Sequence, residues 1–76
     1  MSLYDQIEKS FTYHPPRDEA EIRAYQDIRA SAKTLALIID EIVPDSREKS
    51  LAITALEQVV FWSNAGVARH GLEEPF

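Results

Sequence analysis

The chain has 76 residues, which is room for one domain only, and it has no cysteine, so neither a disulfide framework nor a thiolate metal site can stabilise so small a core. Its formal net charge of −5 argues against nonspecific binding of DNA or RNA, whereas a small phosphorylated ligand needs only a few well-placed arginines. No apolar run approaches the ~20 residues of a membrane span, and the N-terminus lacks the features of a signal peptide, so we expect a soluble protein that is not exported by that route.

The first predicted element is a short N-terminal helix over residues 1–10. Leu3, Tyr4 and Ile7 lie on one side of it. Helices of about two turns have low intrinsic stability in water, so packing must hold this one in place.

A proline-rich strut over residues 11–17 follows. Its two prolines fix φ, remove two backbone donors and disfavour helical geometry at His14 and Pro15. Tyr13 is therefore held stiffly and can either stack on a planar ligand, at roughly 1–3 kcal/mol per base, or pin the strut by packing. His14 can donate to a phosphate or have a structural role.

Two long helices over residues 18–43 and 45–70 complete the predicted fold. Their apolar positions recur at spacings of three and four, as on the buried face of a helix. Pro44 ends the first helix, and Asp45 with Glu48 predicts a capping box that opens the second.

Gly71 is predicted to cap the second long helix, with an irregular tail over residues 72–76. The predicted fold is thus all-α, with a short N-terminal helix and a long antiparallel helical hairpin in a single domain of residues 1–76.

Both long helices are apolar over an arc that is wider than one partner helix can cover. At about 100° per residue, the apolar positions between 51 and 60 occupy roughly half of the helix circumference. A two-helix hairpin cannot bury such a surface, so we expect the surplus faces to meet other copies in a homo-oligomer.

Several cations and polar residues are candidates for ligand contacts. Arg29, a turn from Lys33, lies at the rim of an apolar arc, where it can snorkel or clamp a phosphate. Arg69 lies on an apolar stripe near a helix end, where it suits either the helix dipole or a pocket at a subunit seam.

Arg47 and Lys49 are cations in a first helical turn, where a bound anion would account for them, although the start of a helix also explains this segment. Asn64 can contact a base edge or make interhelical hydrogen bonds. The sequence has no glycine-rich phosphate loop, no His-x-x-x-His and no serine elbow, so we expect no enzyme, no catalytic residue, no metal and no cofactor.

Three motifs together carry a resemblance to a known family. They are Phe-Thr-Tyr-His-x-Pro from residue 11, Pro-Asp-Ser-Arg-Glu-Lys-Ser from residue 44, and Trp-x-Asn-Ala-x-x-Ala-Arg from residue 62. Over roughly residues 11–70 the chain resembles the small helical-hairpin sponges that phages use against CBASS immunity. The same hairpin domain occurs in sponges of Thoeris immunity.

The resemblance implies an all-α homohexamer that captures cyclic di- and trinucleotide messengers without cleaving them, in the cytoplasm of the infected bacterial host. No DNA or RNA polymer and no membrane is implied as a partner. By motif, cyclic dinucleotides would lie between protomers, with a base on Tyr13 and phosphates on Arg29. Cyclic trinucleotides would use separate sites at Arg69, to which Ser31 is a further carry-over.

The candidate set also contains His14 and Lys33 for the dinucleotide site, and Phe11, Arg47, Lys49 and Asn64 as further candidates. Two alternatives stay open, namely a sponge for another immune signalling nucleotide and an oligomeric helical adaptor that binds a protein partner in an apolar groove. A third alternative is an enzyme that hydrolyses nucleotides with His14 as general acid or base. It is the least expected of the three, because the sequence shows no set of metal ligands for such a reaction.

Overall fold

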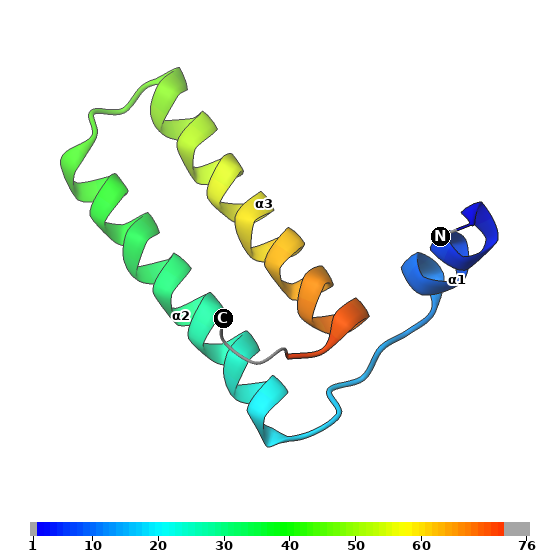
Figure 1. Ribbon diagram of the computed structural model, residues 1–76. Helices are drawn as coiled ribbons and strands as arrows, with labels where there is room; N and C mark the ends of the chain where they lie inside the picture. Colours follow the sequence, from blue (N-terminus) through cyan, green and yellow to red (C-terminus); the bar gives the residue numbers. More distant parts are fainter. Residues whose placement is uncertain (1, 73–76) are drawn as a thin grey trace.

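The computed structural model describes residues 2–72, and in this part of the chain it is all-α, without strands. Helix α1 spans Leu3–Phe11, α2 spans Glu19–Ile42 and α3 spans Arg47–His70. Figure 1 shows α2 and α3 side by side as an antiparallel hairpin, with α1 apart from them beyond an extended segment. The predicted combination of a short N-terminal helix and a long helical hairpin is confirmed.

Helix α1 is capped at both ends but is not buried. Ser2 Oγ accepts from the Asp5 N–H at 3.1 Å, and the Thr12 N–H donates to the Glu8 carbonyl at 3.1 Å. The helix ends at Phe11, which therefore belongs to α1 and not to the strut. No residue of α1 is buried, so the described part of the chain does not supply the packing that such a short helix needs.

Local chemistry sets both ends of α2. Asp18 is the N-cap, and its Oδ1 accepts from the Glu21 N–H at 2.9 Å. At the other end Val43 is extended, with φ −89° and ψ 129°. Because Val43 precedes Pro44, helical geometry is disfavoured there and the helix ends at Ile42.

The predicted capping box of Asp45 and Glu48 is wrong. Ser46 is the N-cap of α3: its Oγ accepts from the Lys49 N–H at 3.1 Å and donates to the Pro44 carbonyl at 2.9 Å. Asp45 instead accepts from the ammonium group of Lys49 at 3.0 Å. Asp45 and Ser46 are both residue types that can cap a helix. Because the Asp45 carboxylate binds Lys49, Ser46 is the residue that caps α3.

Gly71 caps α3, as predicted. Its φ is +73°, a conformation that favours glycine, and its N–H donates to the Val67 carbonyl at 2.8 Å. The predicted irregular tail falls outside the described residues, apart from Leu72, which is not helical.

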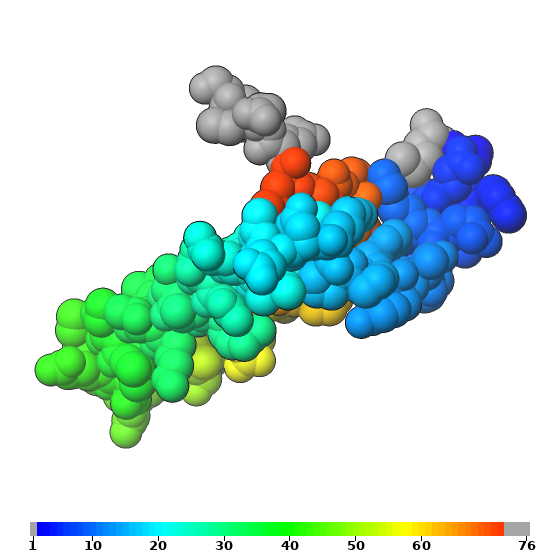
Figure 2. Space-filling model, turned by 90° about the horizontal axis from the view of Figure 1, so that it is seen from below, coloured from blue at the N-terminus to red at the C-terminus, as the bar shows by residue number. Residues whose placement is uncertain are grey.

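The described residues contain no buried apolar side chain. Large apolar residues are exposed on all three helices, among them Tyr4, Leu37, Leu51 and Trp62. The radius of gyration is 15.5 Å, against roughly 11 Å for a compact chain of this length. Figure 2 shows the elongated outline, with the hairpin turn at one end and α1 at the other. Residues 2–72 of a single chain thus form no buried core, and the homo-oligomer stays a prediction that this surface favours.

Candidate functional site

Two open grooves lie along the hairpin and share the lining residues Ala32, Leu56 and Val60. At about 100° per residue, Ser31 and Lys33 project to opposite sides of Ala32, so the grooves flank the α2–α3 seam on its two sides. We call them the serine groove and the arginine groove. No helix in the described part of the chain is long and apolar enough to cross a membrane.

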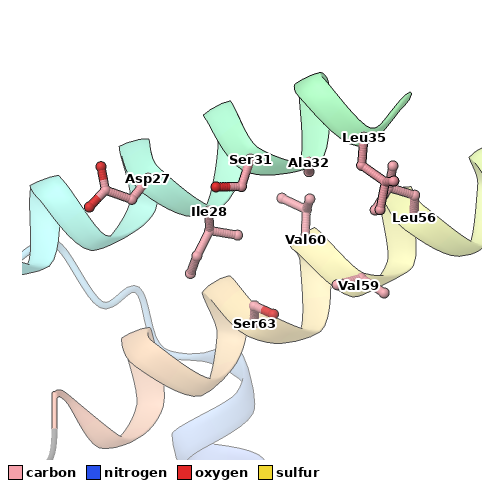
Figure 3. A pocket seen from close by; sticks show the side chains of 9 residues that line it. All are labelled: Asp27, Ile28, Ser31, Ala32, Leu35, Leu56, Val59, Val60 and Ser63. Carbon is pink, nitrogen blue, oxygen red and sulfur yellow. The ribbon is translucent and has the colours of Figure 1, made fainter. Parts of the chain in front are cut away.

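The serine groove has a volume of about 430 Å³ and a mostly apolar lining. Figure 3 shows Ser31 on α2 and Ser63 on α3 between Asp27 at one end and Leu35 at the other. Its full lining is Asp27, Ile28, Ser31, Ala32, Leu35, Leu56, Val59, Val60 and Ser63. This lining includes a carboxylate and no basic side chain, so within one chain it offers hydroxyls but no positive charge for a phosphate.

The arginine groove has a volume of about 320 Å³ and carries Arg29 and Lys33 over an apolar floor. Its lining is Arg29, Ala32, Lys33, Ala36, Ile53, Leu56, Glu57 and Val60. The two cations are four residues apart on α2, where like charges destabilise a helix by roughly 0.2–0.5 kcal/mol. An anion between them would relieve this repulsion, while Glu57 on α3 supplies part of the opposing charge.

The strut presents Tyr13 to solvent. Tyr13 is 81% exposed and lines neither groove, so one chain does not bring Tyr13 and Arg29 together. Phe11, at the end of α1, is exposed as well.

His14 has a structural contact. Its Nε2 lies 2.7 Å from the Lys9 carbonyl oxygen. Because a carbonyl only accepts, Nε2 carries the proton and donates it, which ties the strut back to the end of α1.

Arg69 and Ser31 do not share a groove in one chain. Arg69 is half-buried in the last turn of α3, roughly 9 Å further along the helix than Ser63 at 1.5 Å per residue. It does not line the serine groove. The two residues that the resemblance assigns to the trinucleotide site therefore lie apart within one protomer.

Lys49 has partners within the chain. Its Nζ lies 2.9 Å from Asp40 Oδ1 and 3.0 Å from Asp45 Oδ1, and the hydrogen bonds to these two carboxylates raise the pKa of Lys49. These contacts account for a cation in the first turn of α3 without a bound anion. Arg47, by contrast, is exposed in that turn.

Asn64 is half-buried on α3. Its Oδ1 atom is buried and has no hydrogen-bond partner among the residues that the structure describes. The interhelical hydrogen bond that the sequence suggested is thus not formed by this acceptor.

A charged cluster that sequence reasoning missed joins the strut to the hairpin. The Nη1 of Arg17 donates to Glu21 Oε2 at 2.9 Å, and its Nη2 donates to the Ala68 carbonyl at 3.0 Å. Glu21 is 3% exposed and is the one buried residue in the described range. The i, i+4 spacing of the two side chains is the signal that points to this pair, whereas the bond to Ala68 has no signature in the sequence.

Comparison with known proteins gives one family match. The model described as "Acb2/Tad1, hairpin domain" matches residues 4–68, which cover most of α1, the strut, all of α2 and most of α3. Comparisons with curated proteins and with solved structures returned no match.

Proposed function

Because this chain belongs to the Acb2/Tad1 hairpin domain family, the family of anti-CBASS and anti-Thoeris sponges, we propose that it binds and sequesters cyclic di- and trinucleotide second messengers without cleaving them. Sequestration deprives the CBASS effector of its activator in the cytoplasm of the infected host. The family match over residues 4–68 is the observation that carries this proposal.

The dinucleotide site is proposed to lie between protomers. Arg29 and Lys33 supply two cations over an apolar floor, which suits a phosphate next to a base. Tyr13 lines neither groove of its own chain and is exposed, so it is free to stack on a ligand held by another copy. The uncovered apolar faces of the hairpin support the homo-oligomer, a hexamer by family, that such a shared site requires.

The trinucleotide site is proposed to be separate and to use Arg69. The serine groove holds Ser31 but also Asp27, and no cation lines it. A phosphate near Ser31 would therefore need Arg69 from a neighbouring copy, because one chain places the two apart.

A hydrolytic enzyme of this kind would use His14 as its acid or base. Its Nε2–H bonds the Lys9 carbonyl at 2.7 Å, which anchors the ring and leaves Nδ1 as the nitrogen for proton transfer. Within residues 2–72, no cluster of three His, Cys, Asp or Glu side chains that could hold a metal ion is found.

Isothermal titration with a cyclic dinucleotide and, separately, a cyclic trinucleotide tests the proposal. The bound ligand is then released by heat and identified by chromatography. We expect tight binding of both, intact ligand and two different stoichiometries, and each ligand should still bind when the other is saturating. Altered ligand would indicate an enzyme, and no binding of either would favour the adaptor or a sponge for another signalling nucleotide.

The variant Arg29→Ala tests the groove, with Arg23→Ala on the same helix as its control. Loss of a hydrogen bond to a charged group costs roughly 1.5–3 kcal/mol, so Arg29→Ala should weaken dinucleotide binding by about 10- to 150-fold. Arg23 is exposed and lines neither groove, so its removal should leave the affinity unchanged. Equal losses in the two variants would indicate a general charge effect instead of a site at Arg29.

A further inference from the structure

The guanidinium group of Arg17 joins three parts of the chain. Its Nη1 donates to both carboxylate oxygens of Glu21, at 2.9 and 3.1 Å, and its Nη2 donates to the Ala68 carbonyl at 3.0 Å. Nη1 also lies 3.5 Å from the Val67 carbonyl. One side chain at the end of the strut thus holds the first turn of α2 and the last turn of α3. We call Arg17 and Glu21 the bracket.

The chemistry of the bracket favours arginine at this position. A carboxylate that is 3% exposed needs a paired charge, and the carbonyls at the end of α3 carry the negative end of the helix dipole, which favours a cation. The planar fork of arginine bonds acceptors in two directions at once, whereas lysine offers a single ammonium centre. Gly71 packs next to the bracket. A Cβ on this glycine would lie in ordinary van der Waals contact with Arg17 Nη1, at 3.7 Å.

The strut is tied at its other end as well. His14 Nε2 donates to the Lys9 carbonyl at 2.7 Å, and Lys9 Nζ lies 3.4 Å from His70 Nδ1 at the end of α3. Along the chain Tyr13 lies between Lys9 and Arg17, whose side chains both contact the end of α3, and its own side chain is mostly exposed. The place of the Tyr13 ring relative to the hairpin therefore depends on contacts that other residues make.

We infer that Arg17 and Glu21 are positioning residues that hold the strut on the end of the hairpin and so preorganise Tyr13 for the ligand, without touching the ligand themselves. The inference rests on the proposed function. A ring that is already ordered in the free protein loses less conformational freedom on binding, so the affinity is higher than for a loose strut. Arg69 lies in the α3 turn that the bracket holds, next to Ala68, so the end of that helix is fixed by the same contacts.

The test compares Arg17→Met, Arg17→Lys and Glu21→Gln with Arg23→Met, which removes an exposed arginine that has no hydrogen bond or ion pair to the described residues. Cyclic dinucleotide affinity is measured by titration calorimetry. Backbone order parameters of Thr12 and Tyr13 are measured by NMR in the free proteins, under conditions where helix content and elution volume match those of the wild type.

For Arg17→Met we expect about ten-fold weaker dinucleotide binding, and order parameters that fall from about 0.85 towards 0.6 in the strut. Arg17→Lys should fall between this variant and the wild type, and Arg23→Met should match the wild type. Unchanged strut order, or unchanged affinity, in Arg17→Met would overturn the inference. A lower Tm with unchanged strut order and affinity would overturn it too, because that is the result of a purely stabilising role.

If Arg17→Met fails to fold, the inference is tested with Arg17→Lys and Glu21→Gln instead, because each of these variants keeps a polar group of similar size. A smaller loss of strut order and a roughly three-fold loss of affinity would support the bracket, and wild-type values would refute it. If the wild type binds no cyclic dinucleotide, the proposed function fails. The order parameters would then still show whether the bracket holds the strut.

Discussion

Lys49 Nζ lies 2.9 Å from Asp40 Oδ1 and so links the first turn of α3 to the last turn of α2 across the hairpin connection. The same ammonium group donates to the Asp40 carbonyl at 2.8 Å and to Asp45 Oδ1 at 3.0 Å. The Lys49 side chain is largely covered, whereas both aspartate side chains are exposed. The ammonium group of Lys49 thus joins the end of α2 to the start of α3 and to Asp45 in the connection between them.

These contacts predict a stability difference that depends on pH. The hydrogen bond to Asp40 and then that to Asp45 raise the pKa of Lys49 above its ordinary value of 10.5. The ion pairs therefore stabilise the fold fully below pH 10.5, and their contribution is lost as the pH rises through the higher folded-state pKa. We expect Lys49→Met to have a lower Tm than the wild type at neutral pH. The difference in Tm should disappear once the pH exceeds the folded-state pKa of Lys49.

Lys33→Met is the control for this pH series, because Lys33 forms no ion pair with the described residues. Its Tm should not lie below that of the wild type at neutral pH, because removing Lys33 relieves the repulsion with Arg29 and breaks no ion pair. A gap for Lys49→Met that stays constant as the pH rises well above 10.5 would contradict the role of the charge.

The two glycines should respond in opposite directions to alanine. Gly71 has φ +73°, so Gly71→Ala is expected to lower stability by about 1–3 kcal/mol through backbone strain. Gly66 lies inside α3, and a Cβ there would meet nothing within 4 Å, so Gly66→Ala should add about 0.5–1 kcal/mol. Thermal melts at matched protein concentration check both. A loss at Gly66 would instead indicate that a neighbouring copy approaches that backbone.

Tyr13→Ala should weaken capture of the dinucleotide and leave the fold and the assembly intact. The ring is exposed, so its removal opens no cavity in the described chain. Loss of one stacked base costs roughly 1–3 kcal/mol, or about 5- to 150-fold in affinity. Tyr13→Phe keeps the stacking surface and should bind nearly as well as the wild type. If Tyr13→Ala dissociated the assembly, Tyr13 would be a packing residue.

Arg69→Ala should impair binding of the cyclic trinucleotide selectively. Arg69 lines neither groove, and Arg29 lies in the arginine groove, so the two arginines can serve different ligands. Removal of a charge-assisted contact should cost roughly 10- to 150-fold for the trinucleotide, with dinucleotide affinity within about a factor of two. Parallel titrations of the two ligands check this. Equal losses for both ligands would argue against separate sites.

Assembly should cover Trp62, which is 61% exposed in the single chain. In an oligomer completed by the apolar faces of α3, we expect blue-shifted emission and weak quenching by acrylamide. Val59→Asp places a charge on that surface and should give a smaller species by light scattering, with red-shifted emission. Emission typical of an exposed indole in the wild-type oligomer would mean that other faces form the contacts.

Local sequence was sufficient to predict the three helices, with ends that differ from those of the structure by up to two residues. The prolines at 15, 16 and 44 and the glycine at 71 act through their own backbone geometry, so their effects need no knowledge of distant residues. The excess of apolar positions also follows from periodicity alone, and the structure confirms that one hairpin leaves it uncovered. The choice of Ser46 over Asp45 as the cap could not be predicted in this way, because it depends on Lys49 binding the aspartate.

The tertiary structure decided which residues share a site. Helical spacing puts Ser31 and Lys33 on opposite sides of Ala32. Which residues of α3 face them follows from the packing of the hairpin, which puts Ser63 in the serine groove and Glu57 in the arginine groove. The bracket at Arg17 is decided in the same way, because one of its acceptors is a backbone carbonyl at Ala68. Every residue has a carbonyl, so no side-chain pattern announces this contact, and only the fold brings that group to the strut.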